Sequence, residues 1–205
     1  MTRMVALVLL ALTLPAAAWA DAISLGNQFG SVSISNSGIV SKGSELQSFN
    51  GIVGSKGHSL GSVSFTTGAL KSGTIAGGGT FSSARPTFVV IGNGHRGVPK
   101  GVIFSGRFVF PITWTLTSQP GNGQLTFQLS GLIEGMLYSG NTVSGSTTQN
   151  IYTTAGQLSR GIGHISGGHT GASEGIILTP EPGTLSLLGS GLVGVAGMFR
   201  RKRVA

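Results

Sequence analysis

Apolar and hydroxyl side chains alternate through the middle of the chain, which is the pattern of β-strands with one buried and one solvated face. The clearest passage, residues 112–117, reads Ile-Thr-Trp-Thr-Leu-Thr and sends three large apolar side chains to one face and three threonines to the other. Turn-forming residues follow at 119–123, and the alternation resumes with Leu125, Phe127 and Leu129. These two runs predict a β-hairpin.

The residues before this hairpin predict another strand. Gly106 lies in its middle as a bulge or a close-packing point, and Pro111 marks a bend at its end. We therefore expect three consecutive antiparallel strands in this region. Four apolar side chains of one parity predict the strand's buried face: Val102, Phe104, Phe108 and Phe110.

Weaker alternation extends the pattern on both sides. Residues 86–91 and 149–153 predict further strands of the same sheet system, and Asn-Gly pairs at 50–51 and 93–94 predict turns. Frequent glycine interrupts residues 23–80, which predicts short strands and long loops there.

The fold class follows from this one-sided alternation. No stretch of residues 21–179 sustains the 3.6-residue apolar period of a helix, so the domain is expected to be all-β. A sheet with one apolar face needs a second layer to cover it, which favours a single antiparallel β-sandwich or jelly-roll-like domain. A β-solenoid is the alternative, although no fixed repeat is present.

The N-terminus has the layout of a secretory signal peptide. Basic Arg3 precedes an apolar run at residues 5–14, and small residues follow. Ala18 and Ala20 form an Ala-x-Ala step, which predicts cleavage before Asp21. Export would then use the Sec translocon and signal peptidase.

The C-terminus carries three parts in a fixed order. A motif, Pro180-Glu181-Pro182, leads into an uncharged apolar stretch at residues 184–199. As a helix this stretch would be about 24 Å long, slightly short of a bilayer core of about 30 Å. A basic cluster then acts as a membrane stop on the cytoplasmic side and is formed by Arg200, Arg201, Lys202 and Arg203.

This tail resembles the PEP-CTERM sorting signal over residues 180–205. The resemblance implies an inner-membrane, tail-anchored precursor of a Gram-negative bacterium. It implies recognition of Pro180, Glu181 and Pro182 by an exosortase, a membrane-embedded cysteine transpeptidase, and cleavage near that motif. The body would pass to the cell surface or to extracellular polysaccharide. The expected division is a signal peptide at 1–20, a β domain at 21–179 and a transmembrane sorting signal at 180–205.

Charge and cysteine content narrow the classes of partner. The net charge is +8, but Arg3 and residues 200–203 supply five of the 13 basic side chains and leave eight against five acids. The eight are scattered singly, which argues against nucleic-acid binding. Zero cysteines exclude disulfides, thiolate metal sites and a cysteine nucleophile.

Candidate catalytic patterns are weak. Residues 92–97 spell G-x-G-x-x-G, but Val98-Pro99 follows where a dinucleotide fold needs a helix, so a glycine-rich turn is expected. A Ser-His-Glu arrangement stays open, although no Gly-x-Ser-x-Gly motif lies on a strand-to-helix turn. The four histidines that could take part are His58, His95, His164 and His169.

Two further arrangements are alternatives to ordinary solvated side chains. Glu134 and Glu174 could pair as the acid and base of a glycosidase. His164, His169 and Glu174 could ligate zinc, but their spacings of five residues match no known motif. We expect no catalytic, cofactor or metal site.

Aromatic side chains offer a different kind of site, a platform on which a sugar ring stacks. The candidates are Trp114, Tyr138 and Tyr152, although the phase of Trp114 indicates core packing. The expected function is that of a non-enzymatic surface or matrix protein with a structural or adhesive role in exopolysaccharide or biofilm. The alternatives are a carbohydrate-binding module and a secreted hydrolase.

Overall fold

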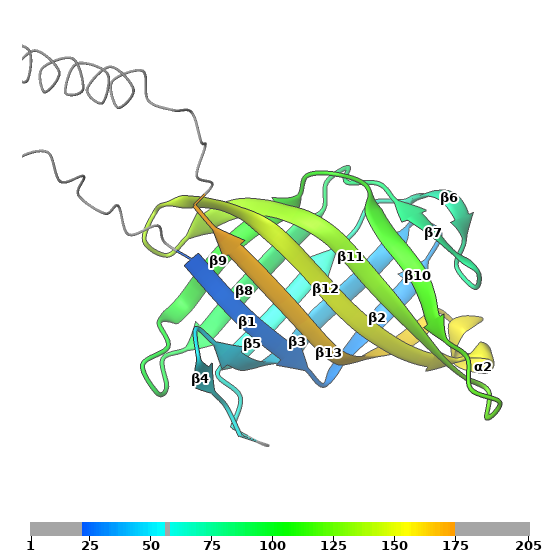
Figure 1. The fold of residues 1–205 in the computed structure, drawn as a ribbon, viewed down its shortest axis with the longest axis horizontal. Helices are drawn as coiled ribbons and strands as arrows, with labels where there is room; N and C mark the ends of the chain where they lie inside the picture. The colour runs from blue at the N-terminus through cyan, green and yellow to red at the C-terminus, as the bar shows by residue number, and fades with distance from the viewer. Residues whose placement is uncertain (1–21, 56–57, 175–205) are drawn as a thin grey trace, which may run out of the picture. The chain divides into compact units, whose positions relative to one another are not determined.

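The computed structural model describes residues 22–55 and 58–174, which form antiparallel strands and a one-turn helix (Figure 1). Contacts divide the chain into one unit at Met1–Glu174 and another at Gly175–Ala205. The elements are β1 (Ala22–Gln28), β2 (Gly30–Ser35), β3 (Gly38–Phe49), β4 (Ile52–Val53), β5 (Gly61–Thr66), β6 (Leu70–Thr74), β7 (Gly78–Phe81), β8 (Thr87–Asn93), β9 (Lys100–Phe108), β10 (Ile112–Ser118), β11 (Gln124–Leu137), β12 (Thr142–Thr154), α2 (Ala155–Leu158) and β13 (Ile162–Ser173).

The strands follow one another as an up-and-down meander that closes on itself. β1 and β2 are two halves of one long strand, because both pair with β3 on one side and with β13 on the other. β5 pairs with β8 while β6 pairs with β7, so these four form one long interrupted hairpin. β9 and β10 both pair with β11, and β12 joins β11 to β13. The result is a closed eight-stranded β-barrel.

The predicted all-β class agrees with this structure, but the predicted β-sandwich or jelly-roll-like arrangement and its β-solenoid alternative are wrong. Alternation requires that one face be covered, and a sheet that curls into a barrel covers its own inner face. The region 23–80 is also not mainly long loops, since β3 alone has 12 residues. The expected three consecutive antiparallel strands are instead β9 and β10, which run in one direction, and β11 beside both.

The predicted signal peptide at 1–20 and transmembrane sorting helix at 184–199 lie outside the described residues. Within the described ranges, no helix is long and apolar enough to cross a membrane.

Aromatic rings fill much of the barrel interior. Trp114 is 1% exposed, stacks on Phe127 with ring centroids 4.4 Å apart, and donates its indole N–H to the Ile75 carbonyl over 2.8 Å. A second group surrounds Phe88, whose ring lies 6.0–6.2 Å from three other rings at close to stacked or edge-on angles. Those three rings belong to Phe65, Phe104 and Phe108. The predicted core position of Trp114 is therefore confirmed.

Inward-facing glycines make room for these rings. A Cβ on Gly106 would lie 2.6 Å from the Phe104 ring, so the close-packing reading of this glycine is confirmed. The bulge lies nearby, where Val90 and Ile91 face Phe104 and Val102 and skip one residue of β9. Val102 is consequently 52% exposed, contrary to the predicted common face. Phe110 is also exposed, because it lies in the bend before β10.

A buried polar cluster crosses the interior between β1, β3, β12 and β13. The Asn27 amide donates to the Ser44 hydroxyl and to the Gln149 carbonyl, each over 2.8 Å. The Gln149 amide donates to Thr147, whose hydroxyl lies 2.7 Å from that of Thr170. These hydrogen bonds satisfy groups that would otherwise be costly to bury.

Trp114→Ala should lower the free energy of unfolding by about 3–5 kcal/mol, because it leaves a cavity and an unpaired carbonyl at Ile75. Urea unfolding of the purified protein measures this change. Tyr138→Ala is the control, since Tyr138 is 62% exposed and its loss should cost less than about 0.5 kcal/mol. Equal effects of the two changes would contradict the packing described.

Asn27→Ala and Gln149→Ala should each cost about 1–3 kcal/mol, because each removes one hydrogen bond from a buried polar partner. The double variant should lose less than the sum, with a coupling energy of about 1 kcal/mol or more. Urea unfolding of the four proteins gives this coupling energy. The exposed pair Ser72 and Thr80, also joined by a hydrogen bond, should show a coupling energy near zero in the same cycle.

Candidate binding surface

A strained turn interrupts the long strand formed by β1 and β2. Phe29 has φ of 57°, a left-handed conformation that bulky side chains rarely adopt, and its ring is 59% exposed. Its N–H donates to the Ile165 carbonyl on β13 over 3.2 Å. Gly30 follows at a point where a Cβ would lie 2.5 Å from Ser44 Cβ. The interior therefore forces the chain to turn here and leaves the Phe29 ring outside.

Two rings stack on the outer surface close to this turn. Tyr152 on β12 faces His164 on β13 directly, with ring centroids 5.3 Å apart and planes 28° apart. Tyr152 remains 37% exposed. A register shift at Asn150 and Ile151 sets this pairing, because it realigns β12 against β13 just before the two rings.

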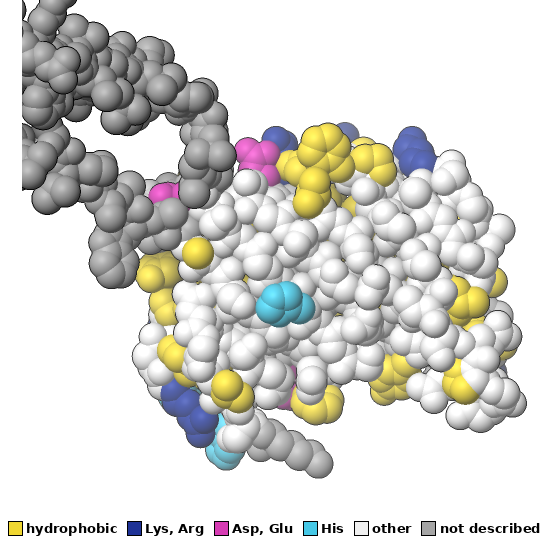
Figure 2. Space-filling view, in the orientation of Figure 1, with side chains coloured by type: hydrophobic (Ala, Val, Ile, Leu, Met, Phe, Trp, Pro, Cys, Tyr) yellow, Lys and Arg dark blue, Asp and Glu magenta, His cyan; other side chains and the backbone are white. Residues whose placement is uncertain are grey.

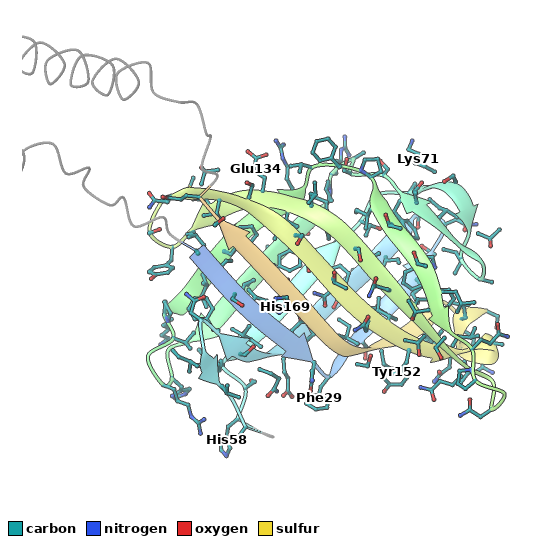
Figure 3. All side chains as sticks on the ribbon, viewed as in Figure 1. Phe29, His58, Lys71, Glu134, Tyr152 and His169 are labelled. Atoms are coloured by element: carbon teal, nitrogen blue, oxygen red, sulfur yellow. The ribbon has the colours of Figure 1, made fainter. Side chains whose placement is uncertain are left out.

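Phe29 and the stacked pair border one hollow of about 450 Å³, which we call the aromatic hollow. Figure 3 shows Phe29 and Tyr152 projecting from the same margin of the barrel. The volume falls in the range of small-molecule sites, about 300–1,000 Å³. Its lining carries hydroxyls and no Lys, Arg, Asp or Glu, and includes Phe29, Gly30, Ser31, Tyr152, His164 and Ser166.

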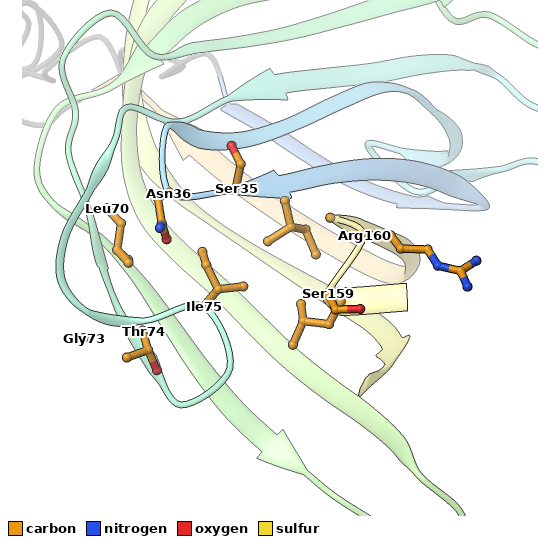
Figure 4. A pocket seen from close by; sticks show the side chains of 11 residues that line it. Ser35, Asn36, Leu70, Gly73, Thr74, Ile75, Ser159 and Arg160 are labelled. Atoms are coloured by element: carbon orange, nitrogen blue, oxygen red, sulfur yellow. The ribbon is translucent and has the colours of Figure 1, made fainter. Parts of the chain in front are cut away.

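A wider cleft of about 820 Å³ opens at the barrel end that carries α2 (Figure 4). It lies between the β2–β3 turn, the β6–β7 hairpin and the residues after α2, with Asn36, Thr74 and Arg160 at its border. A capping box between Thr154 and Gln157 fixes the start of α2. The cleft has apolar walls from Ile34 and Leu158, but it is shallow and open.

Two of the sequence candidates, His58 and His95, meet in a third hollow of about 500 Å³. The Asn93 amide donates to the Ser59 carbonyl there, and the Arg96 guanidinium donates to the Val53 carbonyl over 3.0 Å. Within the described structure, no hydrogen bond joins the Ser59 hydroxyl to either imidazole. The nucleophile–base contact of a serine hydrolase is therefore not formed here.

The G-x-G-x-x-G segment at 92–97 forms a turn, as expected. Gly94, Arg96 and Gly97 have φ of 83°, 56° and 85°, and strand β9 follows instead of a helix. The chain also contains a formal Gly-x-Ser-x-Gly at 57–61, but its Ser59 precedes strand β5. Neither segment has the strand-to-helix geometry that its motif needs.

The proposed metal ligands do not converge. His164 and His169 lie five residues apart on β13, about 16 Å along an extended strand, so one metal ion cannot contact both. Among the described residues no group of three potential ligands is close enough to hold a metal. Glu134 borders a shallow hollow with Arg107 and Met136, and Glu174 is not part of that lining.

Of the three aromatic candidates, Tyr152 lies in a hollow with other rings. Trp114 is in the core, and Tyr138 lies exposed in the turn between β11 and β12. Phe29 is not among the residues predicted from the sequence. Its signal was the change of apolar parity between Leu25 and Val32, which requires an irregular residue between them.

Comparison with protein families identifies a known motif in the C-terminal residues. Residues 178–203 match the model described as the PEP-CTERM protein-sorting motif. The chain carries a PEP-CTERM sorting motif. Comparison with curated proteins and with solved structures gives no match.

The PEP-CTERM match runs from two residues before Pro180 to Arg203 and so includes both the predicted motif and the basic cluster. These residues lie outside the described part of the chain. A PEP-CTERM tail makes this an exported protein that an exosortase sorts to the cell surface.

Phe29→Gly should raise the free energy of unfolding by about 1 kcal/mol. Glycine adopts positive φ without the penalty of about 1–2 kcal/mol that other residues pay, and the exposed ring contributes little burial. Phe29→Ala keeps the Cβ and should show no such gain. Urea midpoints of the three proteins test this, and a glycine variant less stable than the alanine variant would refute it.

Proposed function

We propose that this protein is a non-enzymatic component of the cell surface or extracellular matrix, with a structural or adhesive role in exopolysaccharide. The observation that carries the proposal is a PEP-CTERM sorting motif attached to a barrel whose interior is packed with side chains. A packed interior leaves the outer surface for any partner. The hydrolase alternative has less support. Among the described residues, the Ser59 hydroxyl donates no hydrogen bond to the nearby imidazole of His58 or His95.

In this proposal the Sec translocon exports the precursor, and signal peptidase cleaves between Ala20 and Asp21. The tail keeps the precursor at the inner membrane of a Gram-negative cell, with the basic residues 200–203 on the cytoplasmic side. The exosortase then cleaves near Pro180, Glu181 and Pro182 and releases the barrel to the surface or matrix.

The outer surface suits contact with an uncharged polymer. Figure 2 shows that the face formed by β1, β13 and β12 is almost free of charged and hydrophobic side chains, apart from one histidine. Rows of Ser and Thr side chains supply hydroxyl donors and acceptors across these strands. No basic patch favours an anionic partner on this face.

The sorting step predicts a specific mass. Protein recovered from the native host should begin near Asp21 and end near Pro182, and a strain without the exosortase should retain residues 200–205. Changing Pro180, Glu181 and Pro182 to alanine should block processing in the same way, while Ser173→Ala on β13 should not. Intact-mass spectrometry of surface and membrane fractions measures this. Identical masses in both strains would refute exosortase processing.

The matrix role predicts retention on polysaccharide. Enzymatic or chemical removal of exopolysaccharide should release most of the mature protein from the cell surface, and purified protein should rebind to the isolated polymer. Quantitative immunoblots of bound and free fractions measure this. The matrix role would be refuted if the protein stays bound to cells without exopolysaccharide and does not bind the isolated polymer.

A further inference from the structure

The barrel backbone constrains the position of Phe29 on one side of the aromatic hollow. Phe29 holds a left-handed backbone conformation, which persists only where the surroundings impose it. The Ile165 carbonyl accepts its N–H, and Gly30 behind it has no space for a side chain. The ring is therefore held at the surface by the barrel itself, so a ligand would find it already in place.

The opposite side of the hollow is equally ordered. Tyr152 and His164 stack on each other from neighbouring strands, so each ring restricts the rotation of the other. An aromatic ring offers a flat apolar face, and the Tyr hydroxyl adds a hydrogen-bonding edge. Between the rings, Ser31 and Ser166 bring hydroxyls to the same hollow. Flat apolar walls with hydroxyls nearby complement a pyranose ring, which has an apolar C–H face and a polar rim.

The hollow also lies on a continuous row that crosses the sheet. Direct cross-strand neighbours connect β2, β13, β12, β11 and β10 at this level, each step spanning about 4.8 Å. None of their side chains is Lys, Arg, Asp or Glu, and all point outward. In order they are Ser31, His164, Tyr152, Thr126 and Ser118.

We propose that the aromatic hollow is a subsite for one pyranose unit of a neutral polysaccharide, whose chain continues along this row toward β10. The absence of Lys, Arg, Asp and Glu from the hollow's lining favours a neutral sugar over a uronic acid or a sulfated one. This inference rests on the proposed matrix function and names the class of polymer that the barrel binds.

Affinity electrophoresis of the mature protein tests the subsite, with gels that contain the host exopolysaccharide, hydroxyethylcellulose, dextran or alginate. Wild-type protein should be retarded by host polymer and by at least one neutral polymer more than by alginate. Tyr152→Ala and Phe29→Gly should each weaken binding about three- to ten-fold, as expected for the loss of one stacking ring. The double variant should show no measurable retardation.

Two features of this design separate lost binding from lost folding. Phe29→Gly should be more stable than wild type while it binds more weakly, which general damage to the fold cannot produce. Tyr138→Ala removes another exposed tyrosine, 62% exposed against 37% for Tyr152, from a turn outside the hollow and should bind within two-fold of wild type. Tyr152→Phe keeps the ring and should retain most of the affinity.

The outcomes distinguish this inference from the proposed function. If the host polymer retards wild type and the hollow variants equally, the subsite is wrong while the matrix function stands. If alginate retards wild type more than every neutral polymer, the ligand class is wrong. If no polymer, including that of the host, retards wild type, both the subsite and the adhesive role fail.

Discussion

Pairing of β13 with both β1 and β2 is the constraint on which the rest of the structure depends. A meander of eight strands has two free edges and one uncovered apolar face, and this last pairing removes all three. It joins residues 129 to 151 positions apart, from Ser33 opposite Ile162 to Ala22 opposite Ser173. With the ring closed, every inward side chain competes for one enclosed volume, which explains the stacked rings and the glycines beside them.

The same closure links the buried polar cluster to the outer aromatic hollow. β13 must pair with two strand segments of different phase, so the chain turns at Phe29. On the inner side of that turn, Asn27 bonds to Ser44 and Gln149, and Gly30 passes close to Ser44. On the outer side the Phe29 ring is left exposed. The turn at Phe29 thus affects both the packing inside the barrel and the shape of its outer surface.

The strands were largely predictable because a period of two leaves a direct record in the sequence. Residues 112–117 and 125–129 alternate as expected, with Trp114 and Phe127 buried and the threonines between them outside. Alternation reports only that one face is covered, and a second sheet or a closed barrel satisfies it equally. The bulge in β9 leaves no mark in the amino-acid composition, which is why Val102 was predicted to be buried. Phe29 was overlooked although the apolar parity changes between Leu25 and Val32. Tyr152 was identified as a platform residue, but its partners depend on register between distant strands.

A filled barrel also constrains where recognition can occur. Large aromatic and aliphatic side chains occupy the interior, so the enclosed space that many barrels use for ligands is taken up by the core. Selectivity must then come from outward side chains, whose spacing the sheet sets at about 4.8 Å between strands. A regular, rigid and uncharged surface of this kind suits a repetitive polymer better than a compact molecule, because each repeat can meet an equivalent row. The left-handed turn at Phe29 supplies a position where that regular surface carries an aromatic wall.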